Sequence, residues 1–262
     1  MLKALADPGL RRREVKPKEN DLDRGISVAW YDLPESGREE YLAWLHGTYI
    51  PKLLKYPGVL WAAHYRNEDS IKPLPRLRHT QDGAIPAGYQ YIFLLGASDA
   101  HKLCALTPYN QKGKRDPADE KMLSMRVGER LSIFTEEARV EGPDAKRREG
   151  EYTPAPCIQL GSFNSGSYED EDELLSWYAD YRLPAMGVIP GSIGLRKLVS
   201  VSGWAKHAVL YEFTSLEDRE KNFRVHEAKK PEIAAWTEKV IAKLVHAPGS
   251  PNVAQRLWPP VK

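Results

Sequence analysis

The sequence has few cysteines, and they form no recognisable pattern. Two of its 262 residues, Cys104 and Cys157, are cysteine, and no C-x-x-C or metal-ligand spacing is present. This absence excludes zinc fingers and disulfide-rich scaffolds, and it predicts no metal site. A reduced intracellular compartment is the simplest interpretation, although a single extracellular disulfide remains open.

Long apolar runs and an excess of one charge are also missing. No stretch approaches the roughly 20 apolar residues that span a bilayer, and the N-terminal segment lacks an apolar core of signal-peptide length. The formal net charge is +2, and positive residues are scattered among nearly as many negative ones. Such a surface offers no basic face to a nucleic-acid backbone. We therefore expect a cytoplasmic protein that binds neither membranes nor nucleic acids.

Cofactor motifs are absent, whereas amphipathic aromatic residues are abundant. The sequence has no nucleophile elbow, dinucleotide fingerprint or phosphate-binding loop, so we predict no cofactor. It has seven tryptophans and thirteen tyrosines but five phenylalanines. Tyrosine and tryptophan rings are apolar but carry one hydrogen-bonding group, so they suit an apolar cavity that must also form hydrogen bonds. This composition favours a small apolar or aromatic ligand. An ordinary core with tyrosines at its margin is the alternative.

An internal repeat organises the chain. The stretch EEYLAWLHGTYIPKLLKYPG at 39–58 is similar to DELLSWYADYRLPAMGVIPG at 172–191. At one constant offset of 133 residues, Glu40, Trp44, Pro51, Pro57 and Gly58 match Glu173, Trp177, Pro184, Pro190 and Gly191. Five identities in one register indicate a repeated helical unit that ends in a Pro-Gly turn.

The segments around each helix indicate strands. GISVAWYDL precedes the first copy and CIQLGSFNS the second, while VLWAAHYRN and SIGLRKLVS follow the Pro-Gly turns. YQYIFLLGASDA corresponds to HAVLYEFTSLED, residues 134–136 to 236–238 on a later helix, and closing strands are expected near RVEG and NVAQRLW. Each half thus has the ferredoxin-like order β-α-β-β-α-β. We predict an α+β protein with a polar extension over 1–24, a first repeat over 25–150 with two loop insertions, and a second repeat over 155–262.

The order of a tryptophan, a proline seven residues later and a Pro-Gly before a strand resembles the EthD-type proteins of the dimeric α+β barrel superfamily. The resemblance implies that the two repeats pair their antiparallel sheets into an internal dimeric α+β barrel. It also implies a small-molecule enzyme: a cofactor-free monooxygenase, an isomerase, or a dehydratase or decarboxylase of aromatic or polyketide-like compounds. The family pattern has a histidine just before the proline, whereas this chain has Tyr49 and Arg182 near that position and His46 one turn earlier.

The first helix carries polar residues on its apolar stripe. Helical spacing places His46 and Tyr49 on one face with Leu42, Leu45 and Leu53. A histidine there can exchange protons near neutral pH, and a tyrosine can donate to a developing oxyanion. A satisfied structural histidine is the alternative interpretation.

A second histidine depends on strand register. His64 shares a strand face with Ala62 and Arg66. If the helix covers that face, His46, Tyr49 and His64 meet in one pocket; if it is the barrel interior or a solvated edge, they do not. We assign catalysis to His46, Tyr49 and His64, and substrate binding to Trp44, Arg66, Trp177, Tyr181, Arg182, His207 and Glu212.

The second repeat has its own candidates. HAVLYEF places His207 and Tyr211 on one face and Glu212 on the other, among apolar neighbours. We expect burial to raise the pKa of Glu212, or Glu212 to pair with Arg182. Some tandem members of the superfamily resemble haem proteins, which would make His207 or His226 the axial ligand.

The leading hypothesis is a cofactor-independent lyase, decarboxylase or isomerase that uses His/Tyr acid–base chemistry on an apolar aromatic or cyclic substrate. A cofactor-free monooxygenase of a phenolic substrate, a haem-binding protein and a non-catalytic ligand-binding module are the alternatives. Sheet edges and long loops could also support a homodimer, so the oligomeric state stays undecided at this point.

Overall fold

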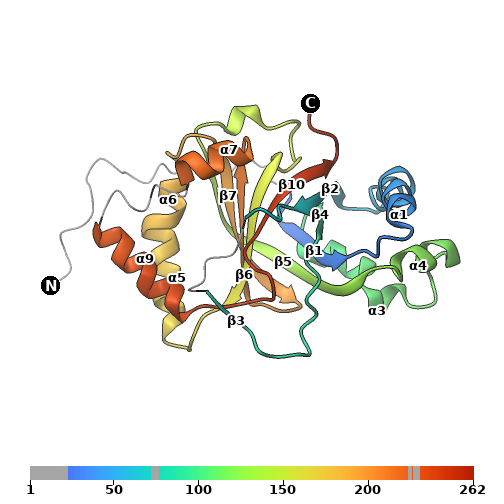
Figure 1. Cartoon of the computed structure of the whole chain (residues 1–262), viewed down its shortest axis with the longest axis horizontal. Helices are drawn as coiled ribbons and strands as arrows, with labels where there is room; N and C mark the ends of the chain where they lie inside the picture. The colour runs from blue at the N-terminus through green and yellow to red at the C-terminus, as the bar shows by residue number, and fades with distance from the viewer. Residues whose placement is uncertain (1–22, 72–76, 224–225, 227–230) are drawn as a thin grey trace.

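The computed structural model describes residues 23–71, 77–223, 226 and 231–262, and it is built around a closed sheet with helices on either side (Figure 1). Most of the extension predicted over 1–24 lies outside the described residues. The elements of the first half are β1 (Gly25–Asp32), α1 (Arg38–Trp44), the π-helix η1 (Leu45–Tyr49), α2 (Ile50–Leu53), β2 (Val59–Asn67), β3 (Arg78–His79), β4 (Tyr91–Ala97), the 3-10 helix η2 (Ala100–Leu106), α3 (Pro108–Gln111), α4 (Pro117–Leu123) and β5 (Val127–Glu141).

The second half repeats this order after a connection that contains a short 3-10 helix, η3 (Ala145–Arg147). Its elements are β6 (Cys157–Asn164), α5 (Asp170–Trp177), the π-helix η4 (Tyr178–Arg182), α6 (Leu183–Met186), β7 (Ser192–Ser202), β8 (His207–Phe213), α7 (Leu216–Asp218), the π-helix η5 (Arg219–Phe223), α9 (Pro231–Lys243), β9 (Val245–His246) and β10 (Asn252–Trp258).

One predicted correspondence is wrong. Residues 134–136 lie in β5, whereas residues 236–238 lie in the helix α9. The insertion of the first half divides its second helical region into η2, α3 and α4, and the long strand β5 comes after them. Apolar residues of a buried strand and of a helix face look alike over so short a stretch. The expected closing strands are confirmed, because β5 ends at Glu141 and β10 covers NVAQRLW.

The sheet closes into a barrel. The strands of the barrel follow the order β10-β2-β4-β1-β5-β7-β8-β6, and a further pairing of β10 with β6 completes the circle. The short strands β9 and β3 extend the sheet beyond β6. The closing strand of each half pairs with the first strand of its own half and with the other half: β5 lies between β1 and β7, and β10 between β6 and β2. Two tandem ferredoxin-like units therefore form the predicted internal barrel.

The barrel is filled with side chains. Every second residue of each strand points inward, and the middle of the interior is apolar, with Val28, Leu94, Phe134, Leu160 and Leu210 all buried. Burying side chains of this size contributes about 1.5–3 kcal/mol each. The interior is thus a packed core, and candidate sites lie outside its centre.

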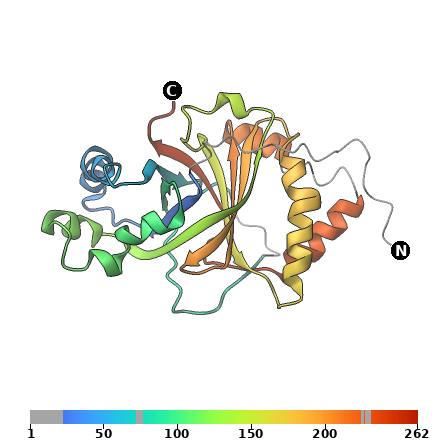
Figure 2. The same cartoon turned by 180° about the vertical axis from the view of Figure 1, so that it is seen from behind.

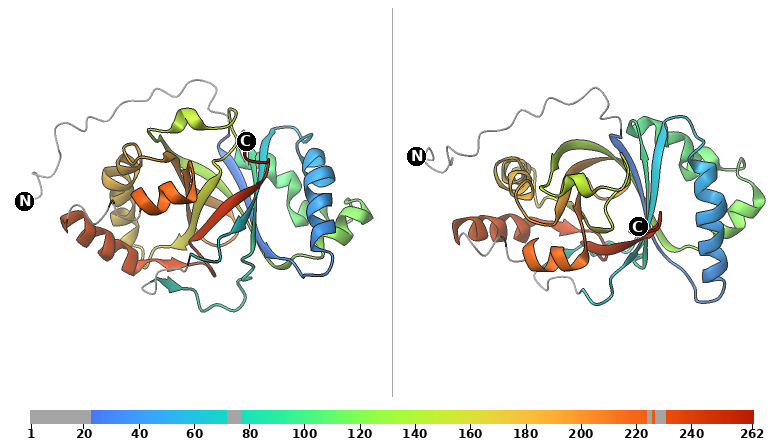
Figure 3. Two further views of the ribbon diagram at one scale, coloured as in Figure 1. Left: turned by 45° about the horizontal axis from the view of Figure 1, so that its top comes forward. Right: turned by 90° about the horizontal axis from the view of Figure 1, so that it is seen from above.

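Two helical layers cover the outer faces of the barrel, and they lie on opposite sides of it (Figures 2 and 3). In the first half, α1, η1 and α2 pack on β1, β2 and β4 through buried residues such as Leu45 and Ile50. In the second half, α5, η4, α6 and α9 pack on β6, β7 and β8. None of the helices in the described ranges is both long and apolar enough to cross a membrane.

Candidate functional site

Both repeat helices widen into a π-helix just before a proline. The turn η1 ends at Tyr49, two residues before Pro51, and η4 ends at Arg182, two residues before Pro184. Proline has no backbone N–H, so the regular hydrogen bond to the carbonyl four residues earlier cannot form there. Single π turns of this kind occur often at functional sites. In the first half, the widened turn holds His46.

Three side chains from separate elements form one hydrogen-bonded group, which we call the Tyr-His-His triad. His46 Nε2 of η1 lies 2.8 Å from His64 Nδ1 of β2, and His64 Nε2 lies 2.9 Å from the hydroxyl of Tyr31 on β1. His64 is fully buried, and His46 is half-buried. The triad therefore runs from the core of the helix–sheet layer toward its surface. The helix covers the strand face of His64, so the register brings His46 and His64 together.

Sequence reasoning missed Tyr31. Strand alternation in GISVAWYD places Tyr31 on the face opposite Trp30, which is the helix-facing side. The sequence therefore indicated the strand face of Tyr31, but it did not show that His64 lies near Tyr31. The strand β4 separates β1 from β2, with Tyr31 opposite Tyr91 and His64 opposite Phe93. Only the strand order brings Tyr31 within hydrogen-bond distance of His64.

Burial controls protonation in the triad. It lowers the pKa of His64 well below its usual value, and nearby His46 and Arg126 lower it further. Burial also lowers the pKa of His46 and raises the pKa of Tyr31 well above 10.0. At neutral pH both imidazoles are therefore uncharged, and Tyr31 keeps its proton. Each uncharged imidazole has one N–H and one lone pair, so the two hydrogen bonds can run in either direction, and reversing them moves a proton along the triad.

Three other candidates of the first half lie apart from the triad's hydrogen bonds. The ring of Tyr49 stacks on Trp44 with centroids 4.7 Å apart, and burial raises its pKa. Trp44 Nε1 donates to Asp119 Oδ1 at 3.3 Å. Arg66 is exposed and does not reach the buried pocket that we expected it to share with His64. Tyr31 thus takes the hydrogen-bonding position expected for Tyr49.

The second half has a different polar group at the corresponding place. Lys197 occupies the repeat position of His64, and its Nζ donates to His207 Nδ1 at 2.9 Å and to Glu137 at 3.1 Å. His207 Nε2 lies 2.8 Å from Glu171 Oε2. Burial lowers the pKa values of both Lys197 and His207. These hydrogen bonds join α5, β5, β7 and β8, which favours a structural role.

Haem ligation does not fit His207. Because the Lys197 ammonium donates to Nδ1, Nε2 must carry the proton that bonds Glu171, and no ring lone pair is left for iron. His226 stacks on Tyr181 with centroids 6.5 Å apart and lies between segments outside the described residues. The described part of the chain also holds no group of three or more histidine, cysteine or acidic residues placed to bind a metal.

Arg182 lies within an aromatic cluster in the second helix–sheet layer. Its guanidinium carbon is 4.7 Å from the Trp177 ring, 5.3 Å from the Phe223 ring and 5.7 Å from the Tyr181 ring. Trp177 Nε1 donates to Thr237 at 3.2 Å. The structure thus brings together three predicted substrate-binding residues, Trp177, Tyr181 and Arg182, in a buried cation–π cluster.

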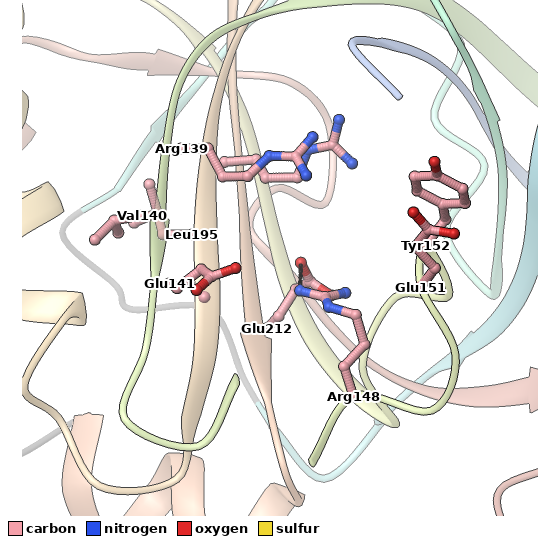
Figure 4. A pocket seen from close by; sticks show the side chains of 10 residues that line it. Arg139, Val140, Glu141, Arg148, Glu151, Tyr152, Leu195 and Glu212 are labelled. Carbon is pink, nitrogen blue, oxygen red and sulfur yellow. Dashed lines mark hydrogen bonds and ion pairs between the residues drawn. The ribbon is translucent and has the colours of Figure 1, made fainter. Parts of the chain in front are cut away.

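The expected environment of Glu212 is wrong. Its carboxylate points into the barrel and pairs with Arg148 from the inter-repeat connection, at 2.6 and 2.9 Å, rather than with Arg182 (Figure 4). The backbone N–H of Ala155 adds a third hydrogen bond at 2.8 Å. Burial raises the pKa of Glu212, but Arg148 outweighs burial, so the net shift is downward. Glu212 is therefore a paired carboxylate, and a role as a base is not favoured.

A cavity of about 180 Å³ lies beside this ion pair at one end of the barrel (Figure 4). Three arginines line it, and each pairs with a carboxylate. Arg196 bonds Asp23 at 2.9 Å and Glu136 at 2.6 Å, and Arg139 bonds Asp23 at 2.5 Å. A buried network in which each charged side chain has a partner makes a structure more rigid. This polar cavity does not match the apolar ligand expected from the sequence.

Comparison with known proteins identifies the fold. No protein-family model and no curated protein matches the chain. A protein described as a candidate monooxygenase from Fusobacterium nucleatum subsp. nucleatum superposes with a TM-score of 0.55 at 10% identity, over 90% of this chain and 94% of the other. An anthrone oxidase-like protein gives a TM-score of 0.57 at 13% identity, over 91% and 92%. The fold is a dimeric α+β barrel.

This dimeric α+β barrel also matches a mutant chlorite dismutase from Candidatus Nitrospira defluvii, with a TM-score of 0.48 at 10% identity, over 90% of both chains. Similarity at this level carries no argument about function. The resemblance to EthD-type proteins is narrower than the fold and stays a prediction. The Tyr-His-His triad is a group whose members can exchange protons with one another through two hydrogen bonds.

Proposed function

We propose that the chain is a cofactor-independent enzyme that transfers a proton on a small, mostly apolar aromatic or cyclic substrate. The observation that carries the proposal is the triad: two uncharged imidazoles in series with a tyrosine hydroxyl, running from a buried strand to a half-buried helix turn. His46 is the base that meets the substrate, because it is the half-buried member. His64 and Tyr31 orient His46 and share its proton.

The product depends on the fate of the carbanion that proton removal leaves. Return of the proton to another atom is isomerisation, and loss of a leaving group is elimination. Reaction of the carbanion with oxygen is the monooxygenase alternative, which the descriptions of the two structural neighbours suggest. All three routes share the first step, so that step is the one to test.

The test is exchange of an acidic C–H for deuterium. The protein is incubated in D₂O with a panel of anthrones, phenols and enolisable cyclic ketones, and deuterium uptake is measured by mass spectrometry while an oxygen electrode records oxygen consumption. We expect exchange above the buffer rate with at least one compound. Removal of the base by His46→Gln should lower the rate about a hundredfold to ten-thousandfold.

Two variants make the test specific. Tyr31→Phe removes a hydroxyl from the triad, and Tyr65→Phe removes another buried tyrosine hydroxyl, which donates to the carbonyl of Ala155 at 2.8 Å. Exchange should fall in Tyr31→Phe and persist in Tyr65→Phe. Equal exchange in His46→Gln and the wild type would rule out His46 as the base.

A further inference from the structure

Arg126, just before β5, is a buried cation next to the triad. Its side chain is 5% exposed, and its guanidinium carbon lies 4.3 Å from the centre of the Tyr31 ring. Nε donates to the hydroxyl of Tyr41 at 2.6 Å, and Nη1 bonds Glu129 at 2.5 Å. Nη2 is buried and, among the described residues, has no hydrogen-bond partner.

An unpartnered nitrogen on a buried guanidinium calls for an explanation. Leaving such a donor unsatisfied costs more than leaving a neutral one, so native structures supply a partner. The carboxylate of Glu129 engages Nη1 and not Nη2, and its side chain is 34% exposed. An acceptor atom of a bound molecule can take this place, and negative charge on that atom would be favoured.

Arg126 also acts on the triad electrostatically. Its charge lowers the pKa of His64, which helps to keep the imidazole pair in the form that accepts a proton. The same charge opposes the effect of burial on the pKa of Tyr31 and favours an anion there. One cation thus favours both a neutral base and a negatively charged oxygen in this layer.

We propose that Arg126 Nη2 binds the oxygen of the substrate, and that the substrate is a phenol or an enolisable ketone. This inference rests on the proposed function. The proton leaves carbon or oxygen of the substrate for the ring nitrogen of His46 that faces away from His64. The electron pair stays on the substrate as an oxyanion, which Arg126 stabilises through a charge-assisted hydrogen bond. Substrates without an ionisable oxygen, and cationic substrates, are excluded.

The probe for this site is 4-nitrophenol, whose phenolate absorbs visible light and whose phenol does not. The full-length protein is titrated into the probe, and absorbance gives both affinity and the ionised fraction of bound probe. We expect the wild type to increase the ionised fraction. Arg126→Met should weaken phenolate binding about tenfold to a hundredfold, the range expected for loss of one charge-assisted hydrogen bond.

Two further variants keep the test independent of folding defects. Glu129→Gln leaves Arg126 in place and removes its partly exposed carboxylate, so phenolate binding should become tighter. Arg147→Met removes an arginine of η3 whose side chain is 64% exposed, and it should leave binding unchanged. Wild-type affinity in Arg126→Met, or no tightening in Glu129→Gln, would overturn the assignment.

The two proposals fail separately. Phenolate binding that depends on Arg126, without deuterium exchange for any compound, would support the oxyanion site and refute the proposed reaction. Deuterium exchange that depends on His46, with phenolate binding unaffected in Arg126→Met, would refute the role of Arg126 and leave the reaction standing.

Discussion

Replacement of His64 should change how the stability of the protein depends on pH. Burial holds the pKa of His64 well below the value of 6.5 that applies to the unfolded chain. Below pH 6.5 the unfolded state therefore binds a proton that the folded state does not. The stabilising contribution is complete above pH 6.5 and is lost as the pH falls toward the folded-state pKa. One such proton changes the free energy of unfolding by about 1.4 kcal/mol per pH unit, or about 2 kcal/mol between pH 7 and pH 5.

The variant His64→Gln removes this titration. At pH 7 it should be less stable than the wild type by about 1–3 kcal/mol, because two buried hydrogen bonds are disrupted. On acidification to pH 5, however, it should lose about 2 kcal/mol less than the wild type. Buried histidines and carboxylates that do not contact His64 titrate in both proteins and cancel in the comparison.

Urea denaturation at pH 7, 6 and 5 gives the free energies directly. His101→Gln, at an exposed histidine, is the matched control. If His64→Gln and the wild type lose equal stability between pH 7 and pH 5, His64 is not held uncharged, and the argument for a neutral imidazole pair fails.

Further predictions concern the barrel and its surroundings. Glu212→Ala should lower the free energy of unfolding by about 3–5 kcal/mol, measured by thermal or urea unfolding, because it leaves the charge of Arg148 without a partner. The double variant with methionine at both positions should recover part of this free energy. A thiol reagent should label Cys104, which is exposed, and spare Cys157 until the protein unfolds, since burial raises the pKa of Cys157 to about 12; labelling of both in the native state would contradict this. Leu45→Ala should cost about 2–5 kcal/mol, as for a fully buried leucine, and a loss under about 1 kcal/mol would show that the helix layer is loose.

The repeat made the architecture predictable. Trp44, Pro51 and the Pro-Gly turn recur at one offset, and the strand patterns around them specify the ferredoxin-like order. The misassigned residues 134–136 lie where the first half carries an insertion, so the offset no longer applied. Local patterns identified elements well wherever the two halves stayed in register.

The site was less predictable, because its contacts join distant segments. His46 and His64 could be placed on a helix face and a strand face, but only the register decided that the faces meet. Tyr31 reaches His64 around an intervening strand, and Arg148 reaches Glu212 from an irregular connection that carries no periodic signal. Neither partner can be derived from spacing along the chain.

Because the two repeats are joined in one chain, the sequence of one repeat can change without the same change in the other. In a barrel assembled from two identical chains, every substitution appears twice, so both helix–sheet layers must tolerate it. Here His64 faces one layer and Lys197 occupies the matching place in the other. One layer can therefore specialise in chemistry while the other specialises in holding the barrel together, and mutations that improve one role need not compromise the other.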